Sequence, residues 1–317
     1  MPWQPLLHGE LASRARDAIA GIAADVPGYA RGHDPASLPS GDAGAAIFYA
    51  YLARAGDERA GPIAEAAMER AMDAVAEEVL PAWLHGGFTG VAWAVEHLWR
   101  GANDEDDDGD DANEEIDAAL VEHLARGGTP AYDLIGGLCG LAVYALERGP
   151  RGEVLLAAIV AELERRAQPA EAGVTLWTPP DELIAETRAQ HPEGYYNLGV
   201  AHGVPAAIAV LGSVPGERAR RLREGLTAWM RSTRHPAPDG SLYPYTIDKR
   251  DPRPNQGCRA AWCYGDPGIA AAFLRGARAA GDAALEALAL EAGLAAAARP
   301  TETAGVVDAG LCHGAAG

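Results

Sequence analysis

The sequence is poor in basic residues, and this shortage excludes several classes of partner. It contains 26 Lys and Arg against 45 Asp and Glu, which gives a formal net charge of −19 at pH 7. Nucleic acids and anionic membrane surfaces repel a protein of this charge. We therefore expect no nucleic acid among its partners.

Long apolar runs are also missing. No run reaches the roughly 20 residues that a membrane-spanning helix needs. The first residues, MPWQPLLHGELASRARDAIAG, lack the pattern of a secretory signal peptide. We expect no transmembrane segment and a cytoplasmic location, with any membrane association made through partners.

Cysteine is scarce, with four residues in a chain of 317. Four cysteines in a chain of this length do not form the dense disulfide framework of a small secreted protein. They fit a cytosolic protein whose thiols are reduced and serve in metal binding or catalysis.

Alternation of apolar and polar residues with a period of two is rare, whereas Ala, Leu, Glu and Arg are abundant. This composition predicts a mostly helical protein. An amphipathic helix is expected over residues 10–25. Further amphipathic patterns cover residues 62–79, 114–125, 153–167, 217–232 and 283–298.

A Gly-x-x-Gly turn followed by an apolar helix recurs between these amphipathic patterns. The turns begin at Gly41, Gly87, Gly137, Gly203, Gly265 and Gly314, and Ala206 replaces the second glycine of the fourth turn. A period near 50 residues with two helices in each repeat predicts a solenoid or a closed ring. In a ring, the apolar helices would form an inner barrel, and the glycine turns would gather around a cavity at one end.

The fifth turn combines a thiol and a guanidinium in the stretch RAAWCYGDPG, residues 259–268. Cys263 follows Arg259 by four residues, so a helical segment would place both on one face. Asp266 as N-cap and Pro267 as first helical residue predict that a helix begins here. Cys263 would then lie on a loop before a helix, as a buried thiol or as a thiolate held by the helix N-terminus or by a metal.

Other turns also carry reactive side chains. Asp133 precedes the third apolar helix and His202 the fourth, and Cys312-His313 stand directly before the sixth turn. If the turns converge, two thiolates and an imidazole make three zinc ligands, with a fourth position open for water or substrate. Such a site can activate an external thiol. A nearby His can act as general acid or base, and an Arg can stabilise an enolate-like oxygen. A metal site, a His and an Arg of this kind are suited to catalysing the addition of a thiol to an electron-poor double bond.

The turns together resemble the successive motifs of the lanthionine synthetase C-like family, the lanthipeptide cyclases. The segments are SLPSGDAGAAIFYAYL, HGGFTGVAWA, YDLIGGLCGLAVYALER, GYYNLGVAHGVP, WCYGDPG and LCHGAAG. The resemblance implies an all-α fold, an α/α-toroid of inner and outer helices, with one zinc ion. It also implies a dehydrated precursor peptide as substrate. Cys thiols of this peptide add to dehydroalanine or dehydrobutyrine and form lanthionine or methyllanthionine thioether rings.

The resemblance also implies roles for single residues and suggests two partner proteins. The zinc ligands of the family correspond to Cys263, Cys312 and His313. His202 corresponds to the general acid or base, and Asp133 and Arg259 to its supporting pair. The pattern alone also allows Asp133 to be the N-cap of the third apolar helix. A lanthipeptide dehydratase and a transporter are the further partners that the resemblance suggests.

The family ring has seven helical hairpins, whereas this sequence ends at the sixth Gly-x-x-Gly turn. We therefore expect a single α/α-barrel cyclase domain over residues 1–317. Without the last repeat, the sequence is either a piece of a longer protein or an incomplete ring that is unstable or inactive, and we favour the first explanation.

Two stretches interrupt the repeat. Residues 103–115, NDEDDDGDDANEE, fit the template of a calcium-binding EF-hand loop from Asp104 to Glu115. Asp111 occupies a slot that normally holds an apolar residue, and an acidic run meets this template by composition alone. A solvated acidic loop is therefore favoured over a Ca²⁺ site at 104–115. Residues 173–196 are expected to form a long loop that serves as a wall for the substrate.

Three other functions are compatible with parts of this pattern. One is a family relative that adds glutathione to dehydroamino acids in proteins. Another is a non-catalytic zinc-containing toroid that serves as a peptide-binding scaffold. A sugar-processing α/α barrel is disfavoured because such sites rely on paired carboxylates, whereas these turns carry thiols.

Overall fold

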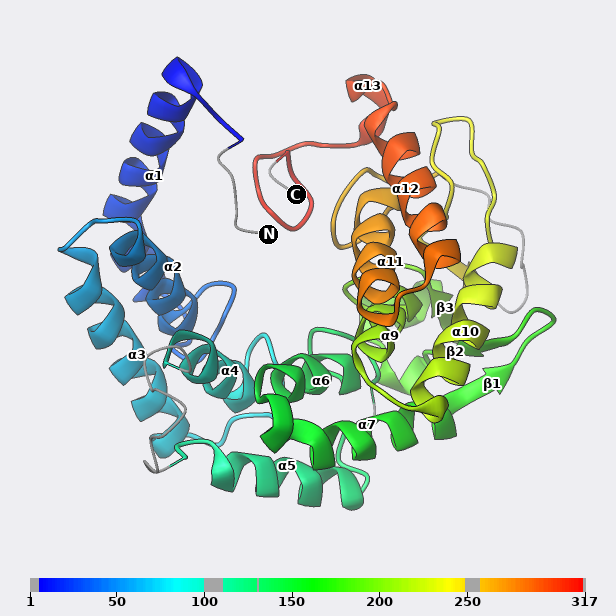
Figure 1. Cartoon of the computed structure of the whole chain (residues 1–317), viewed down its shortest axis with the longest axis horizontal. Helices are drawn as coiled ribbons and strands as arrows, with labels where there is room; N and C mark the ends of the chain where they lie inside the picture. The colour runs from blue at the N-terminus through cyan, green and yellow to red at the C-terminus, as the bar shows by residue number, and fades with distance from the viewer. Residues whose placement is uncertain (1–5, 100–110, 130, 249–256, 316–317) are drawn as a thin grey trace. The chain divides into compact units, whose positions relative to one another are not determined.

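The computed structural model describes residues 6–99, 111–129, 131–248 and 257–315 (Figure 1). The chain divides into two compact units, Met1–Asp111 and Ala112–Gly317, and each has its own set of packed helices. The expectation of a single domain over residues 1–317 stays a prediction.

The first unit is built from four helices in its described part. They are α1 (Gly9–Ala30), α2 (Asp42–Arg54), α3 (Ala60–Glu77) and α4 (Phe88–Trp99). The apolar helix α2 packs against both α3 and α4. Small buried residues such as Ala43, Ala46 and Ala71 line this contact, and they allow the helices to approach closely.

The second unit contains further pairs of helices that follow one another in the sequence and pack together. The longer helices are α5 (Glu114–Ala125), α6 (Leu138–Glu147), α7 (Glu153–Arg166), α9 (Val204–Ser213), α10 (Glu217–Ser232), α11 (Asp266–Ala280) and α12 (Ala283–Ala297). The short helices are η1 (Gly149–Gly152), η2 (Pro180–Glu182), α8 (Ala185–Gln190) and α13 (Thr301–Ala304).

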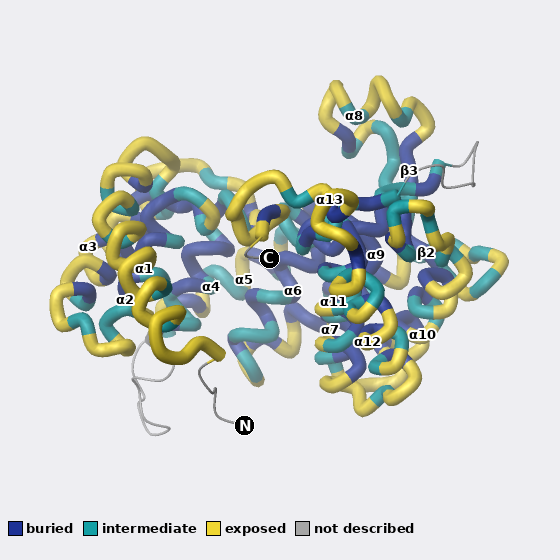
Figure 2. The backbone as a smooth tube through the Cα atoms, turned by 90° about the horizontal axis from the view of Figure 1, so that it is seen from above, coloured by how far each residue is buried: buried dark blue, intermediate teal, exposed yellow. Residues whose placement is uncertain are grey.

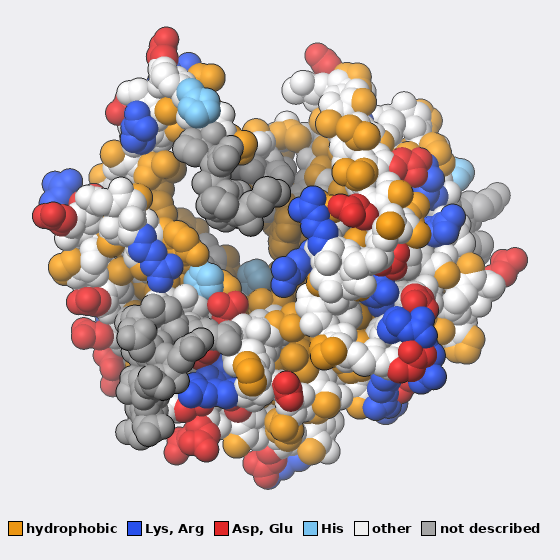
Figure 3. Space-filling view, viewed as in Figure 1, with side chains coloured by type: hydrophobic (Ala, Val, Ile, Leu, Met, Phe, Trp, Pro, Cys, Tyr) orange, Lys and Arg blue, Asp and Glu red, His pale blue; other side chains and the backbone are white. Residues whose placement is uncertain are grey.

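The apolar helices of this unit form its inner layer. α9 packs against α6 and α11, and each of these three helices packs against the helix that follows it. The amphipathic pattern expected over residues 283–298 was wrong, because α12 carries leucines on both its buried and its exposed sides: Leu285 is buried, whereas Leu290 and Leu294 are exposed. Figure 2 shows buried backbone along α6 and α9 and exposed stretches along α10 and α12. On the surface, acidic and arginine side chains are interspersed (Figure 3). On α10, for example, Arg220 pairs with Glu217 and Glu224 at 2.7 and 2.8 Å.

Three of the glycine turns leave no room for a side chain at their second glycine. A Cβ on Gly44, Gly90 or Gly268 would lie 1.9–2.1 Å from the carbonyl oxygen of the residue six positions earlier. In the fifth turn, Gly268 donates its N–H to the carbonyl of Ala261 at 3.3 Å. The loop backbone therefore satisfies the first N–H groups of the following helix, which have no partner within the helix itself.

Four short strands form two antiparallel pairs that the sequence did not indicate. β1 (Ala167–Pro169) pairs with β2 (Val174–Leu176), and β3 (Tyr195–Asn197) pairs with β4 (Thr246–Asp248). Strands of three residues are too short to show a period of two. The expectation of one long loop over residues 173–196 was therefore wrong, because that stretch contains β2, η2, α8 and the start of β3.

Two further expectations concern the acidic run and the membrane. Most of the calcium template at 104–115 lies outside the described residues, and its described end, from Asp111, leads into α5. The Ca²⁺ site therefore stays a prediction. In the part of the chain that the structure describes, no helix is both long and apolar enough to cross a bilayer.

Candidate active site

Four loops of the second unit are joined by a ladder of three backbone hydrogen bonds. Leu134 donates its N–H to the carbonyl of Ala201 at 3.1 Å, and Ala201 donates to Cys263 at 3.3 Å. Cys263 in turn donates to the carbonyl of Cys312 at 3.0 Å. These loops carry all six residues that the sequence singled out for a site.

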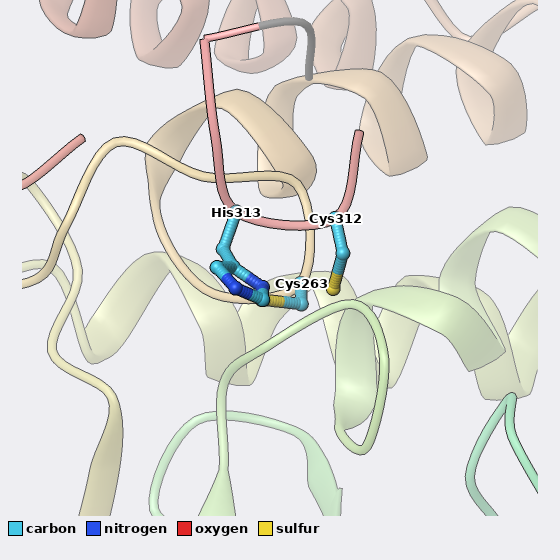
Figure 4. Close-up of side chains that lie close together, drawn as sticks. All are labelled: Cys263, Cys312 and His313. Carbon is cyan, nitrogen blue, oxygen red and sulfur yellow. The ribbon is translucent and has the colours of Figure 1, made fainter. Parts of the chain in front are cut away.

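Two of the loops bring two thiols and an imidazole together. Figure 4 shows the side chains of Cys263, Cys312 and His313 close to one another. One potential ligand atom from each lies within 4.8 Å of the others. Cys263 is buried, whereas Cys312 and His313 are exposed. Partial desolvation of the sulfur and the neighbouring Cys263 thiol raise the pKa of Cys312 to about 11, so this thiol is protonated at neutral pH unless a cation stabilises the thiolate.

The loop that carries Cys263 is irregular. Residues 257–265 contain no helical turn, so the expected helical face shared by Arg259 and Cys263 is not formed. Gly265 has φ +122°, and a Cβ there would lie 1.9 Å from the carbonyl oxygen of Arg259. Only glycine adopts this backbone region readily while the chain passes so close to itself.

Asp266 has a different role from the N-cap that the sequence predicted. The N-cap of α11 is Gly265, and Asp266 is the first helical residue. Its buried carboxylate accepts hydrogen bonds from the backbone N–H groups of Leu242 at 2.8 Å and Tyr243 at 3.2 Å. Burial raises the pKa of Asp266 to about 6 despite these two bonds. Asp266 therefore ties the site loop to the segment before β4.

His202 and Asp133 form a direct pair. Nδ1 of His202 is 2.8 Å from Oδ2 of Asp133, and Gly136 donates its N–H to Oδ1 at 2.8 Å. Burial by itself would raise the pKa of Asp133, but the hydrogen bonds from His202 and Gly136 outweigh it and hold this pKa below its usual value. The ionised carboxylate accepts the Nδ1 proton, which leaves Nε2 of His202 as the nitrogen available to a substrate.

The alternative role of Asp133 as a helix cap is not seen. The N-cap of α6 is Gly137, and no side chain caps that helix. The carboxylate of Asp133 instead bonds to the imidazole and to the loop amide.

A cavity of about 200 Å³ opens beside this pair. Asp133 and His202 line it from the loops before α6 and α9. Much of the remaining wall comes from residues 178–195, including Thr178, Ile184 and Thr187. The stretch that was expected to serve as a substrate wall therefore does border a cavity, although it is partly helical and partly strand.

Glu182 also lines this cavity and was not identified from the sequence. Its Oε1 accepts a hydrogen bond from Arg166 at 3.2 Å, whereas its buried Oε2 has no hydrogen-bond partner. Burial raises the pKa of Glu182 above its usual value in spite of the Arg166 contact. No motif in the sequence distinguishes Glu182 from the many other acidic residues.

Arg259 lies close to the thiols through its loop rather than through a helix. Its backbone N–H donates to the hydroxyl of Tyr245 at 3.0 Å. Hydrogen bonding to Tyr245 raises the pKa of Arg259, so the guanidinium is always charged. This positive charge favours the thiolate form of Cys312.

Two tyrosines connect the Arg259 loop with His202. The ring centroids of Tyr245 and Tyr264 are 5.5 Å apart, and those of Tyr264 and His202 are 6.4 Å apart. Asn197 donates from Nδ2 to the Tyr264 hydroxyl at 2.9 Å. Tyr245 and Asn197 were not identified from the sequence. Asn197 stands in the same motif as His202 and could have been singled out there.

The other two cysteines are buried, as expected of structural thiols. Cys139 is wholly buried in α6, and Cys258 is 1% exposed. Burial raises the pKa of both thiols, that of Cys258 to about 12. Neither thiol therefore forms a reactive thiolate at neutral pH.

Comparison with known proteins identifies a protein family and a similar solved structure. A family model described as "Lanthionine synthetase C-like protein" matches residues 32–317. A search of curated proteins finds no match. Among solved structures, a chain titled "Nisin cyclase" is similar with a TM-score of 0.76 and 20% sequence identity, covering 95% of this chain and 79% of that chain. This likeness confirms the predicted fold class, an all-α α/α-toroid.

Proposed function

Because the chain belongs to the lanthionine synthetase C-like family, we propose that it is a zinc-dependent lanthipeptide cyclase. Family membership and the fold of nisin cyclase support the predicted enzyme class, which forms thioether bonds. The proposed substrate is a dehydrated precursor peptide. Its Cys thiols would add to dehydroalanine or dehydrobutyrine and close lanthionine or methyllanthionine rings.

The observation that carries this proposal is the backbone ladder between the four loops. It places the cluster of Cys263, Cys312 and His313 and the His202–Asp133 pair on directly hydrogen-bonded loops. A reaction that joins a thiol to a double bond needs a thiol-activating group and a proton-transfer group close together.

The donor set fits zinc. Two cysteine sulfurs and one histidine nitrogen are ligands that Zn²⁺ prefers, and three protein ligands leave one position for an external group. We propose that Cys263, Cys312 and His313 hold one Zn²⁺. When bound, the ion supplies a lowered pKa for the thiol of a substrate cysteine.

The remaining steps belong to side chains of the second unit. A carbon–sulfur bond forms at the β-carbon of the dehydroamino acid, and a proton must reach its α-carbon, with no oxidant and no leaving group. We assign His202 as the group that moves this proton through Nε2, because Asp133 holds Nδ1. Arg259 would stabilise the negative charge that develops on the carbonyl oxygen of the acceptor residue.

The remaining proposals concern the cellular location of the protein and its partner proteins. We infer that the protein acts in the cytoplasm on a peptide already dehydrated by a lanthipeptide dehydratase. A transporter for the cyclised peptide is a further partner of this proposal. Any contact with a membrane would then be made through these partners.

The test uses a synthetic peptide with one cysteine and one dehydroalanine, incubated with the zinc-loaded protein. Thiol alkylation followed by mass spectrometry should show loss of the free thiol without change in peptide mass. Chiral analysis of the lanthionine and the rate relative to buffer separate catalysis from spontaneous closure. His202→Asn should slow ring closure by about 10²–10⁴-fold and leave the zinc content unchanged; an unchanged rate would remove His202 from the mechanism.

The same assay separates the other functions. Addition of glutathione to the mixture should leave the product unchanged; a glutathione adduct as the main product would instead support the glutathione-adding relative. Peptide binding without turnover, unaffected by His202→Asn, would support the non-catalytic scaffold.

A further inference from the structure

Asp308 lies beside His313 in the last described loop and has no role in the mechanism above. Its Oδ2 is 3.3 Å from Nε2 of His313. The two side chains are 41% and 46% exposed, and such exposed pairs contribute little to folding stability. The contact is therefore better explained by what it does to the imidazole ring.

The loop is closed around the Asp308 residue. Oδ1 of Asp308 accepts the N–H of Gly310 at 2.7 Å, and its backbone carbonyl accepts the N–H of Ala315 at 2.9 Å. A Cβ on Gly314 would lie 2.1 Å from the same Oδ1. The glycine of the sixth turn thus leaves space for this carboxylate, and the loop backbone fixes the carboxylate before it meets His313.

The contact distinguishes the two nitrogens of the His313 ring. A carboxylate next to Nε2 favours a proton on that nitrogen, which leaves Nδ1 as the nitrogen with a lone pair for a metal. A histidine ligand whose other nitrogen donates to a carboxylate is fixed in orientation and is a stronger base.

We propose that Asp308 is a positioning residue of the metal centre: it accepts the Nε2 proton of His313 and so presents Nδ1 to the metal beside Cys263 and Cys312. This inference rests on the proposed zinc site and adds to it a fourth residue that does not itself ligate the ion.

The first experiment measures zinc affinity by competition with a chromophoric chelator. Asp308→Asn keeps an oxygen for the Gly310 amide and removes the charge, and Asp308→Ser keeps a turn acceptor too short to reach His313. We expect both variants to bind zinc about 10–100-fold more weakly than the wild type. Glu302→Gln is the matched control: it removes one charge from the exposed side of α13, and we expect its affinity to stay within about twofold because surface charges there act weakly.

The second experiment reads the tautomer directly. In nitrogen-15 spectra of the zinc-loaded protein, His313 should show a protonated Nε2 and a metal-bound Nδ1. Zinc bound through Nε2 would overturn the inference, and so would a wild-type affinity in both Asp308 variants. If the wild type binds no zinc, the proposed metal site itself is wrong. If all four proteins bind zinc with equal affinity, the metal site stands and only the role of Asp308 is wrong.

Discussion

At the scale of single residues, the site consists of groups whose partners decide their chemistry. Asp133 accepts a hydrogen bond from the His202 ring, Asp308 lies beside the His313 ring, and the surrounding loop buries Cys263. Asp133 comes from a distant part of the sequence, whereas Asp308 lies only five residues before His313. The cluster of Cys263, Cys312 and His313, and His202 could be singled out from motifs, because they stand next to the glycine turns. Glu182 and Tyr245 could not, because only the folded chain brings them to the site, and Asp308 could not, because no motif marks it although it stands near Cys312 and His313 in the sequence.

Asp133→Asn tests the most direct of these pairs. The amide cannot accept the Nδ1 proton as a carboxylate does, so His202 loses its fixed tautomer and its charge stabilisation. We expect turnover to fall by about 10²–10⁴-fold while zinc content and the thermal midpoint stay near wild type. Single-turnover ring closure measures the effect, and a rate equal to wild type would show that the pair is only structural.

Asp266 gives a prediction about pH. Between its ordinary pKa of 3.8 and its folded value of about 6, the native protein holds a proton that the unfolded chain has released. The free energy of unfolding that Asp266 contributes is therefore greatest below pH 4 and falls as the pH rises to 6. Relative to Asp266→Asn, which does not titrate, the wild type should lose about 1–3 kcal/mol over this range. Urea unfolding at pH 4, 5, 6 and 7 measures this difference, and a constant difference would contradict it.

At the scale of elements, the predicted helices were confirmed closely. The amphipathic patterns at 114–125 and 217–232 coincide with α5 and α10. Helical periodicity is a local property, so it can be read before the chain folds. The two strand pairs and the irregular loop at 257–265 depend on contacts between distant segments, so no local sequence pattern predicts them.

The glycine turns make a prediction at this scale. In Gly268→Ala the new Cβ would overlap the Trp262 carbonyl, so the loop before α11 must shift and carry Cys263 with it. We expect a loss of about 1–3 kcal/mol of stability together with weaker zinc binding. Gly293→Ala in α12 is the control, because its Cβ meets Ala270 at an ordinary 3.6 Å; alanine in a helix should stabilise it by up to about 1 kcal/mol. Equal effects of the two changes would disprove the close-contact explanation.

At the scale of the whole molecule, all six site residues belong to the second unit, Ala112–Gly317. A metal that binds only the folded second unit stabilises that unit and not the first. Removal of zinc by a chelator should therefore raise amide hydrogen exchange in residues 257–315 and leave α2 and α3 unchanged. Exchange measured by mass spectrometry on both forms checks this, and a uniform increase over both units would show that they respond as one body.

The ladder from Leu134 through Ala201 and Cys263 to Cys312 contains no side-chain atom. The glycines of the turns are fixed by close backbone contacts, but the ladder itself does not depend on the reactive side chains of the four loops. Those reactive residues could therefore be exchanged without loss of the spacing between the loops. A scaffold of this kind can exchange its reactive groups during evolution, or in the laboratory, and keep a pocket of the same dimensions for a different reaction.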